Sequence, residues 1–108
     1  MPEDEEAIEE ALVLNGPVPA AIHVTANFFM YSTGVFEDSQ CNPKNLNHAI
    51  LIVGYGQTAN GLKYWLIKNS WGPEWGEGGY VKLRRGENMC GIATMAYTPL
   101  YTYKEKPA

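Results

Sequence analysis

The sequence lacks the features of a membrane-spanning or nucleic-acid-binding chain. No apolar run approaches the ~20 residues that a helix needs to cross a bilayer. Lysine and arginine total 8 against 12 acidic residues, and they form no basic stripe. Met1 is followed at once by proline and an acidic run, so we expect no signal peptide. We therefore predict neither a membrane nor a nucleic acid as a partner. The remaining composition, 45% hydrophobic over 108 residues, predicts one globular domain with a buried core.

Cysteine is also scarce, with only Cys41 and Cys90 present. Two cysteines are compatible with one disulfide, with half of a metal site or with two free thiols, and an oxidising compartment would favour the disulfide. A zinc site could in principle combine them with His23 and His48. The chain has no Cys-x-x-Cys or His-x-x-x-His spacing to support it, so we predict no metal and no cofactor.

Apolar periodicity and turn residues divide the chain into one helix and a series of short strands. Ile8, Ala11 and Leu12 follow helical spacing, acidic residues crowd the start of that segment, and Asn15-Gly16 followed by proline ends it. The pattern predicts a helix at 4–14, helical turns at 26–31, a polar loop at 37–46, and strands at 18–24, 48–56, 62–68, 79–84 and 92–97. We therefore predict an α+β fold, with one N-terminal helix and an antiparallel, barrel-like sheet.

The turn at 58–61, which ends in Asn60-Gly61, predicts a hairpin between its two flanking strands. His48 opens the first of these strands and Asn69 follows the end of the second, so we expect the two side chains to be neighbours. The asparagine oxygen could accept Nδ1–H of the imidazole and leave Nε2 pointing outward as a base. Trp71 is placed to shield that hydrogen bond from water. The alternative is a satisfied histidine at a strand end with tryptophans that pack a core.

Three stretches carry a family resemblance. They read NHAILIVGYG at 47–56, YWLIKNSWGPEWGEGGYVKLRRGENMCGI at 64–92 and NGPVPAAI at 15–22. They resemble the second half of papain-like cysteine proteases, in the style of the cathepsin L-like branch. The resemblance runs from about residue 5 to about residue 100. It implies that residues 1–108 are a single domain, the C-terminal (right) half of a papain-like peptidase.

The resemblance implies specific roles for four residues of the catalytic region. His48 resembles the catalytic histidine that pairs with a cysteine thiolate, and Asn69 resembles the asparagine that orients it. Trp71 resembles the tryptophan that covers their hydrogen bond. Trp75 resembles the tryptophan that lines the primed side of the cleft.

The resemblance also assigns a disulfide and a substrate pocket. Cys41 and Cys90 match two cysteines that are disulfide-bonded in cathepsin L-like enzymes, where the bridge ties two chains together after processing. A nucleophilic role for either thiol is then disfavoured. The pocket for the second residue before the cut is formed by apolar positions: Ala21, Leu46, Ala49 and Met95. With no acid at its base, such a pocket should prefer leucine, phenylalanine or valine.

The nucleophile of the family is missing from this chain. It lies in a Gln…Cys-Gly-Ser-Cys-Trp stretch of the N-terminal (left) domain, and no such stretch occurs here. We therefore expect a segment of a lysosomal or secreted cysteine endopeptidase, inactive alone, whose partners are the left domain and a peptide or protein substrate. The alternative is a non-catalytic binding or scaffold module, although such a module would not need His48 and Asn69.

Overall fold

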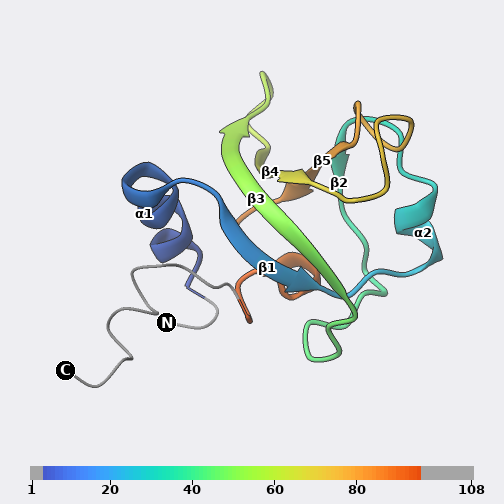
Figure 1. Ribbon diagram of the computed structural model, residues 1–108, viewed down its shortest axis with the longest axis horizontal. Helices are drawn as coiled ribbons and strands as arrows, with labels where there is room; N and C mark the ends of the chain where they lie inside the picture. Colours follow the sequence, from blue (N-terminus) through green and yellow to red (C-terminus); the bar gives the residue numbers. More distant parts are fainter. Residues whose placement is uncertain (1–3, 96–108) are drawn as a thin grey trace.

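This computed structural model describes residues 4–95. Within them, one main helix and one short helix accompany a five-stranded sheet (Figure 1). In chain order the elements are α1 (Glu5–Asn15), β1 (Val18–Ile22), α2 (Ala26–Phe29), β2 (Val35–Phe36), β3 (His48–Gln57), β4 (Lys63–Lys68), β5 (Tyr80–Arg84) and the 3₁₀ helix η1 (Met89–Gly91). The predicted α+β class is confirmed. Within the same residues, no helix is both long and apolar enough to span a membrane.

Helix α1 follows the predicted pattern within one residue at each end. The Asp4 side chain caps its N-terminus by accepting the Ala7 N–H at 3.2 Å. Ile8 and Ala11 are buried against the sheet. The helix ends at Asn15, and the C-cap residue Gly16 has a φ of 91°, a conformation that glycine adopts without strain.

The sheet has the strand order β1-β3-β4-β5-β2. Its pairs are antiparallel except for β2 and β5, which run parallel, so the prediction of a wholly antiparallel sheet was wrong at this edge. Strand β2 is only two residues long, too short for a periodic pattern to reveal it in the sequence. The register of β3 against β4 shifts between Ile52 and Gly54, as expected of a β-bulge, which bends a strand.

The predicted hairpin is confirmed. Strands β3 and β4 pair from Gln57 opposite Lys63 to Leu51 opposite Lys68. Trp65 and Ile67 of β4 alternate with more exposed residues and are fully buried. The largest fully buried side chains of the core come from α1, α2, the sheet and the segment after η1: Trp65, Phe28, Ile8, Ile22, Ile52, Ile67, Leu83, Ile92, Val18 and Val81.

The strand predicted at 92–97 is wrong over residues 92–95, and residues 96–97 lie outside the described residues. A turn follows η1 in its place. The Asn88 side chain holds this turn, because it accepts the Ala93 N–H at 2.8 Å and donates to the Thr94 hydroxyl at 3.1 Å. Ile92 and Ala93 are nevertheless buried. Their apolar side chains therefore indicate a buried segment, but not a strand.

Candidate active site

The proposed histidine and asparagine come from the two strands of the hairpin. His48 is the first residue of β3, and Asn69 follows the last residue of β4. The backbone N–H of Asn69 donates to the Gly79 carbonyl at 3.0 Å, which fixes the asparagine beside the start of β5. The Asn69 side chain is buried, with only 5% of the residue exposed. Antiparallel pairing therefore brings together two residues that lie 21 positions apart in the sequence.

A hydrogen bond joins the two side chains, but not through the expected ring nitrogen. Nε2 of His48 lies 2.8 Å from Oδ1 of Asn69. The same oxygen accepts the Ser70 N–H at 2.8 Å, which identifies it as an acceptor and places the hydrogen on Nε2. The predicted use of Nδ1 was therefore wrong. Strand pairing determines which side chains meet, whereas the imidazole torsions decide which nitrogen faces the partner.

Aromatic rings surround this hydrogen bond. The Trp71 ring lies beside His48, with 4.8 Å between ring centroids and 40° between planes. Phe28 of α2 contacts both rings, at 6.2 Å from His48 and 5.6 Å from Trp71. Phe29 is 60% exposed and stacks on Trp71 at 4.8 Å and 9°. The sequence analysis placed these two phenylalanines within helical turns at 26–31 and did not assign them to the site, because nothing in their local pattern links α2 to His48.

Trp75 packs one layer further along the same aromatic cluster. Its ring lies 5.3 Å from Trp71 in an edge-to-face arrangement and 4.9 Å from Phe28. Its indole Nε1–H donates to the Phe28 carbonyl at 3.2 Å. The long loop between β4 and β5 thus carries two tryptophans that attach it to α2 and to His48.

The four residues predicted to line an apolar pocket lie near the start of β3 or follow η1. Ala21 and Ala49 are register partners across β1 and β3. Ala49 also lines a hollow of about 280 Å³ together with Asn69. Leu46 packs against Gly91, where a β-carbon would come within 2.7 Å of its side chain. Met95 is 64% exposed on the turn that follows η1.

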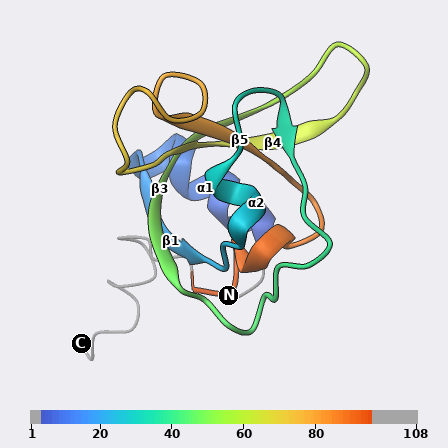
Figure 2. The ribbon, with the colours of Figure 1, turned by 90° about the vertical axis from the view of Figure 1, so that its right-hand side faces the viewer.

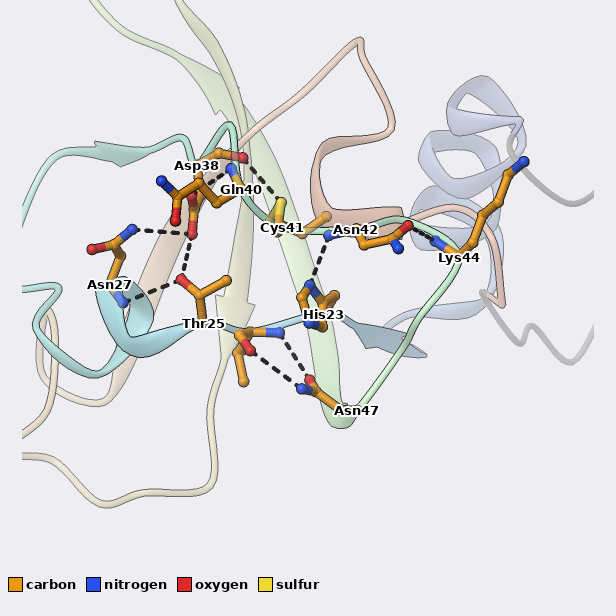
Figure 3. Close-up of a disulfide and its surroundings, with 11 residues drawn as sticks. His23, Thr25, Asn27, Asp38, Gln40, Cys41, Asn42, Lys44 and Asn47 are labelled. Atoms are coloured by element: carbon orange, nitrogen blue, oxygen red, sulfur yellow. Dashed lines mark hydrogen bonds between the residues drawn. A yellow bond between two sulfur atoms is a disulfide. The ribbon is translucent and has the colours of Figure 1, made fainter.

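Cys41 and Cys90 form a disulfide, with 5.1 Å between their α-carbons (Figure 3). The pairing that the resemblance implied is therefore confirmed. The bridge joins the polar loop that leads to His48 to the helix η1. Because both thiols are used, neither is free to coordinate zinc or to act as a nucleophile.

The residue before His48 is also fixed by its side chain. Asn47 Oδ1 accepts the Val24 N–H at 2.8 Å, and its Nδ2 donates to the Val24 carbonyl at 3.2 Å. Its backbone N–H donates to the Ile22 carbonyl at 3.0 Å. The side chain therefore continues the β1–β3 ladder one step beyond the paired residues. Figure 3 shows Asn47 at the end of the loop that carries Cys41. Sequence reasoning missed this role.

The same loop contains Asp38, which is buried at 7% exposure. Its carboxylate accepts the Thr25 hydroxyl at 2.6 Å and the Gln40 N–H at 2.9 Å (Figure 3). Burial by itself would raise the pKa of Asp38. These hydrogen bonds outweigh burial, with smaller contributions from Asn27 and His23, and hold the pKa below its ordinary value of 3.8. Thr25 in turn caps α2, so the carboxylate links the loop to the base of that helix.

Residues 1–100 match the family described as papain family cysteine protease. The chain therefore belongs to this family. Bovine pro-cathepsin H is 50% identical over 99 residues, which cover 90% of this chain and 29% of that protein. The cathepsin L-like peptidase of Aedes aegypti is also 50% identical over 99 residues, with the same coverage. The chain thus spans less than a third of these cysteine proteases.

A solved structure shares the fold. Digestive procathepsin L 3 from the larval midgut of Tenebrio molitor superimposes with a TM-score of 0.85 and 47% sequence identity. The match covers 91% of this chain and 33% of that chain. The resemblance of the three sequence stretches to cathepsin L-like proteases is therefore supported by both sequence and structure comparisons.

Proposed function

We propose that this chain supplies the base of a cysteine endopeptidase, with His48 as the catalytic residue and Asn69 as the residue that orients it. The observation that carries the proposal is the 2.8 Å hydrogen bond from His48 Nε2–H to Asn69 Oδ1 beside Trp71. This bond fixes the neutral tautomer of the imidazole and leaves the lone pair on Nδ1. Nδ1 makes no hydrogen bond within residues 4–95, so it is the nitrogen that would serve the reaction.

The reaction needs a thiol from a segment that this sequence does not contain. The thiol proton would pass to Nδ1, giving a thiolate and an imidazolium. The thiolate would attack the scissile carbonyl, and Nδ1–H would then protonate the leaving amine. Water, deprotonated by Nδ1, would hydrolyse the acyl-enzyme and regenerate the thiol. Throughout, Asn69 would retain the Nε2 hydrogen bond, and Trp71 would limit the access of water to it.

Four small or apolar residues support a preference for apolar side chains at the second residue before the cut. Ala21, Leu46 and Ala49 lie near the start of β3, and Met95 lies on the turn after η1. None of them carries a charge that would attract arginine. Trp75 would contribute to the wall of the primed side through its packing on Trp71.

The nucleophile-bearing left domain is the partner that this proposal requires. Residues 1–108 would be the right domain of the peptidase, and the isolated chain would not hydrolyse peptides. The disulfide supports a parent protein that acts in an oxidising compartment, either secreted or lysosomal.

The test is complementation. The chain is co-expressed with the nucleophile-bearing domain of a papain-family relative, and hydrolysis of a peptide with leucine at the second position before the cut is measured. We expect hydrolysis from the pair and none from either part alone. His48→Ala should abolish it. Asn69→Ala should lower kcat by about 10- to 100-fold, because the imidazole is then free to rotate.

The matched control is His23→Ala, which removes the other histidine, whose Nδ1 accepts the Asn42 N–H at 2.7 Å. This variant should retain hydrolysis. If the two domains form a stable complex that binds peptide but never cleaves it, the chain is a binding or scaffold module and the catalytic proposal is wrong.

A further inference from the structure

We infer that Glu77 is a positioning residue, whose carboxylate holds the loop 70–79 so that Trp71 stays over the His48–Asn69 pair. The inference deepens the proposed function, since its importance for hydrolysis rests on the role proposed for His48. Its structural content, the attachment of the tryptophan loop through one carboxylate, can be tested without hydrolysis.

The loop is rich in glycine, so contacts outside it are needed to offset the entropy that is lost when it is ordered. It contains four glycines, Gly72, Gly76, Gly78 and Gly79, all with positive φ. Glycine has the largest conformational freedom in the unfolded chain, so ordering this loop is costly in entropy. Within the loop, the Trp75 N–H donates to the Gly72 carbonyl at 3.3 Å and the Gly79 N–H donates to the Trp75 carbonyl at 2.7 Å. In Figure 2 this segment is the gold-to-orange loop that extends beyond the strands of the sheet.

Glu77 connects the loop to a distant turn between α2 and β2. Its Oε2 accepts the Thr33 hydroxyl at 2.8 Å and the Gly34 N–H at 2.9 Å. Its Oε1 lies 3.5 Å from Nζ of Lys82 on β5. Hydrogen bonds to an ionised acceptor are about twice as strong as neutral ones, and here three donors converge on one carboxylate.

The turn that Glu77 holds is itself connected to the tryptophans. The Tyr31 hydroxyl donates to the Gly34 carbonyl at 2.6 Å, and it accepts the Lys82 N–H at 3.3 Å. The Tyr31 ring lies 5.5 Å from Trp75. A β-carbon on Gly76 would come within 3.1 Å of that ring and 2.6 Å of a backbone oxygen, so the loop is pressed closely onto Tyr31. Glu77 is therefore connected to Trp75 through Gly34 and Tyr31 as well as through the loop backbone.

The charge state of Glu77 is set by these donors. Burial would raise its pKa, but the Gly34 N–H, the Thr33 hydroxyl and the Lys82 charge outweigh burial and hold the pKa below its ordinary value of 4.5. Tyr31 faces the same carboxylate, and its own pKa is raised, mainly by burial. The carboxylate thus stays ionised, and the attachment intact, in moderately acidic solution. Protonation at lower pH removes an acceptor site and the attraction to Lys82.

Three variants of the 108-residue chain separate this role from a general loss of structure. Glu77→Ala removes every acceptor. Glu77→Gln retains one oxygen for Thr33 and Gly34 but cannot titrate. Glu74→Ala is the matched control, because Glu74 is an exposed glutamate of the same loop without a hydrogen bond or ion pair in residues 4–95. The readout is acrylamide quenching of tryptophan fluorescence, in which the fully buried Trp65 contributes a constant background.

We expect Glu77→Ala to raise the quenching constant about twofold or more relative to Glu74→Ala, because the loop opens. Exchange of the His48 Nε2–H with water, followed by NMR, should accelerate about tenfold in the same variant. Acidification below pH 4.5 should increase quenching in the parent chain and in Glu74→Ala but not in Glu77→Gln.

Equal quenching and equal exchange in Glu77→Ala and Glu74→Ala would overturn the inference. If Glu77→Ala does not fold, the comparison of Glu77→Gln with Glu74→Ala below pH 4.5 decides, since identical acid transitions would exclude Glu77 as their source. In the two-domain complex, Glu77→Ala should lower kcat more than it raises KM. A complex that never hydrolyses peptide would contradict the proposed function but leave the quenching result valid.

Discussion

The Nε2 atom of His48 and the Oδ1 atom of Asn69 lie 2.8 Å apart, and the Ser70 N–H donates to the same oxygen. An oxygen that already accepts a backbone N–H must face the imidazole as an acceptor. The neutral ring therefore carries its proton on Nε2, and Nδ1 is the basic nitrogen.

This tautomer is the first prediction. The ¹⁵N chemical shifts of the neutral His48 ring should show a protonated Nε2 and an unprotonated Nδ1. In Asn69→Ala the two nitrogens should approach the averaged shifts of an exchanging ring, because no acceptor selects one tautomer. A neutral His48 that carries its proton on Nδ1 in the parent chain would contradict the observed hydrogen bond.

The second prediction concerns Asn47, whose side chain pairs with both backbone groups of Val24. Asn47→Ala should lower the free energy of unfolding by about 1 kcal/mol, since two exposed hydrogen bonds are replaced by bonds to water. Asn45→Ala is the matched control, because that exposed asparagine makes only a backbone hydrogen bond within residues 4–95. Denaturant unfolding measures both, and equal midpoints would show that the Asn47 pairing adds no stability.

The third prediction concerns the attachment of α1 to the sheet. The Glu5 carboxylate accepts Trp65 Nε1–H at 2.7 Å, the Gly86 N–H at 2.9 Å and the Asn88 N–H at 2.6 Å. Glu5→Ala should cost about 2–4 kcal/mol, because it leaves the indole of the fully buried Trp65 without its acceptor. Glu10→Ala, on the exposed side of the same helix, should change stability by less than about 0.5 kcal/mol. Similar losses in both variants would rule out a specific anchor at Glu5.

The fourth prediction is a pH dependence from Asp38. Because its pKa in the folded chain lies below the ordinary value of 3.8, the ionised carboxylate stabilises the fold above that pH. The stabilisation should disappear as the pH falls through the folded pKa. Asp38→Asn should therefore be less stable than the parent chain at pH 6, and the difference should shrink below pH 3.8. A difference that stays constant from pH 6 to pH 3 would refute the depressed pKa.

The fifth prediction concerns the disulfide between Cys41 and Cys90, which are 49 residues apart. In the chain-entropy model a loop of this length contributes about 4 kcal/mol. The double substitution to serine should therefore lower the unfolding free energy by about that amount when measured against the oxidised parent. Reduction of the parent should produce the same loss. An unchanged denaturation midpoint after complete reduction would mean that the bridge does not stabilise the fold.

Much of the site follows from the sequence, because it depends on local rules. The turn at Asn60-Gly61 and the two apolar strands predict a hairpin, and antiparallel pairing then brings His48 next to Asn69. The position of Trp71, two residues after Asn69, restricts its ring to the same neighbourhood. The helix α1 follows from apolar spacing and from the Asn15-Gly16 stop. The family resemblance supplied the cysteine pair, which the spacing of two cysteines left open.

Tertiary structure alone decided the features that depend on side-chain torsions and on contacts between distant segments. The imidazole nitrogen that faces Asn69 is set by rotation within the site, which strand pairing does not specify. Two further features join segments that lie 43 or more residues apart: the parallel pairing of β2 with β5 and the hydrogen bond between Glu77 and Gly34. No local sequence pattern predicts them. The segment at 92–95 has the apolar composition of a strand, but Asn88 and the disulfide at Cys90 hold it as a turn in which Ile92 and Ala93 are buried.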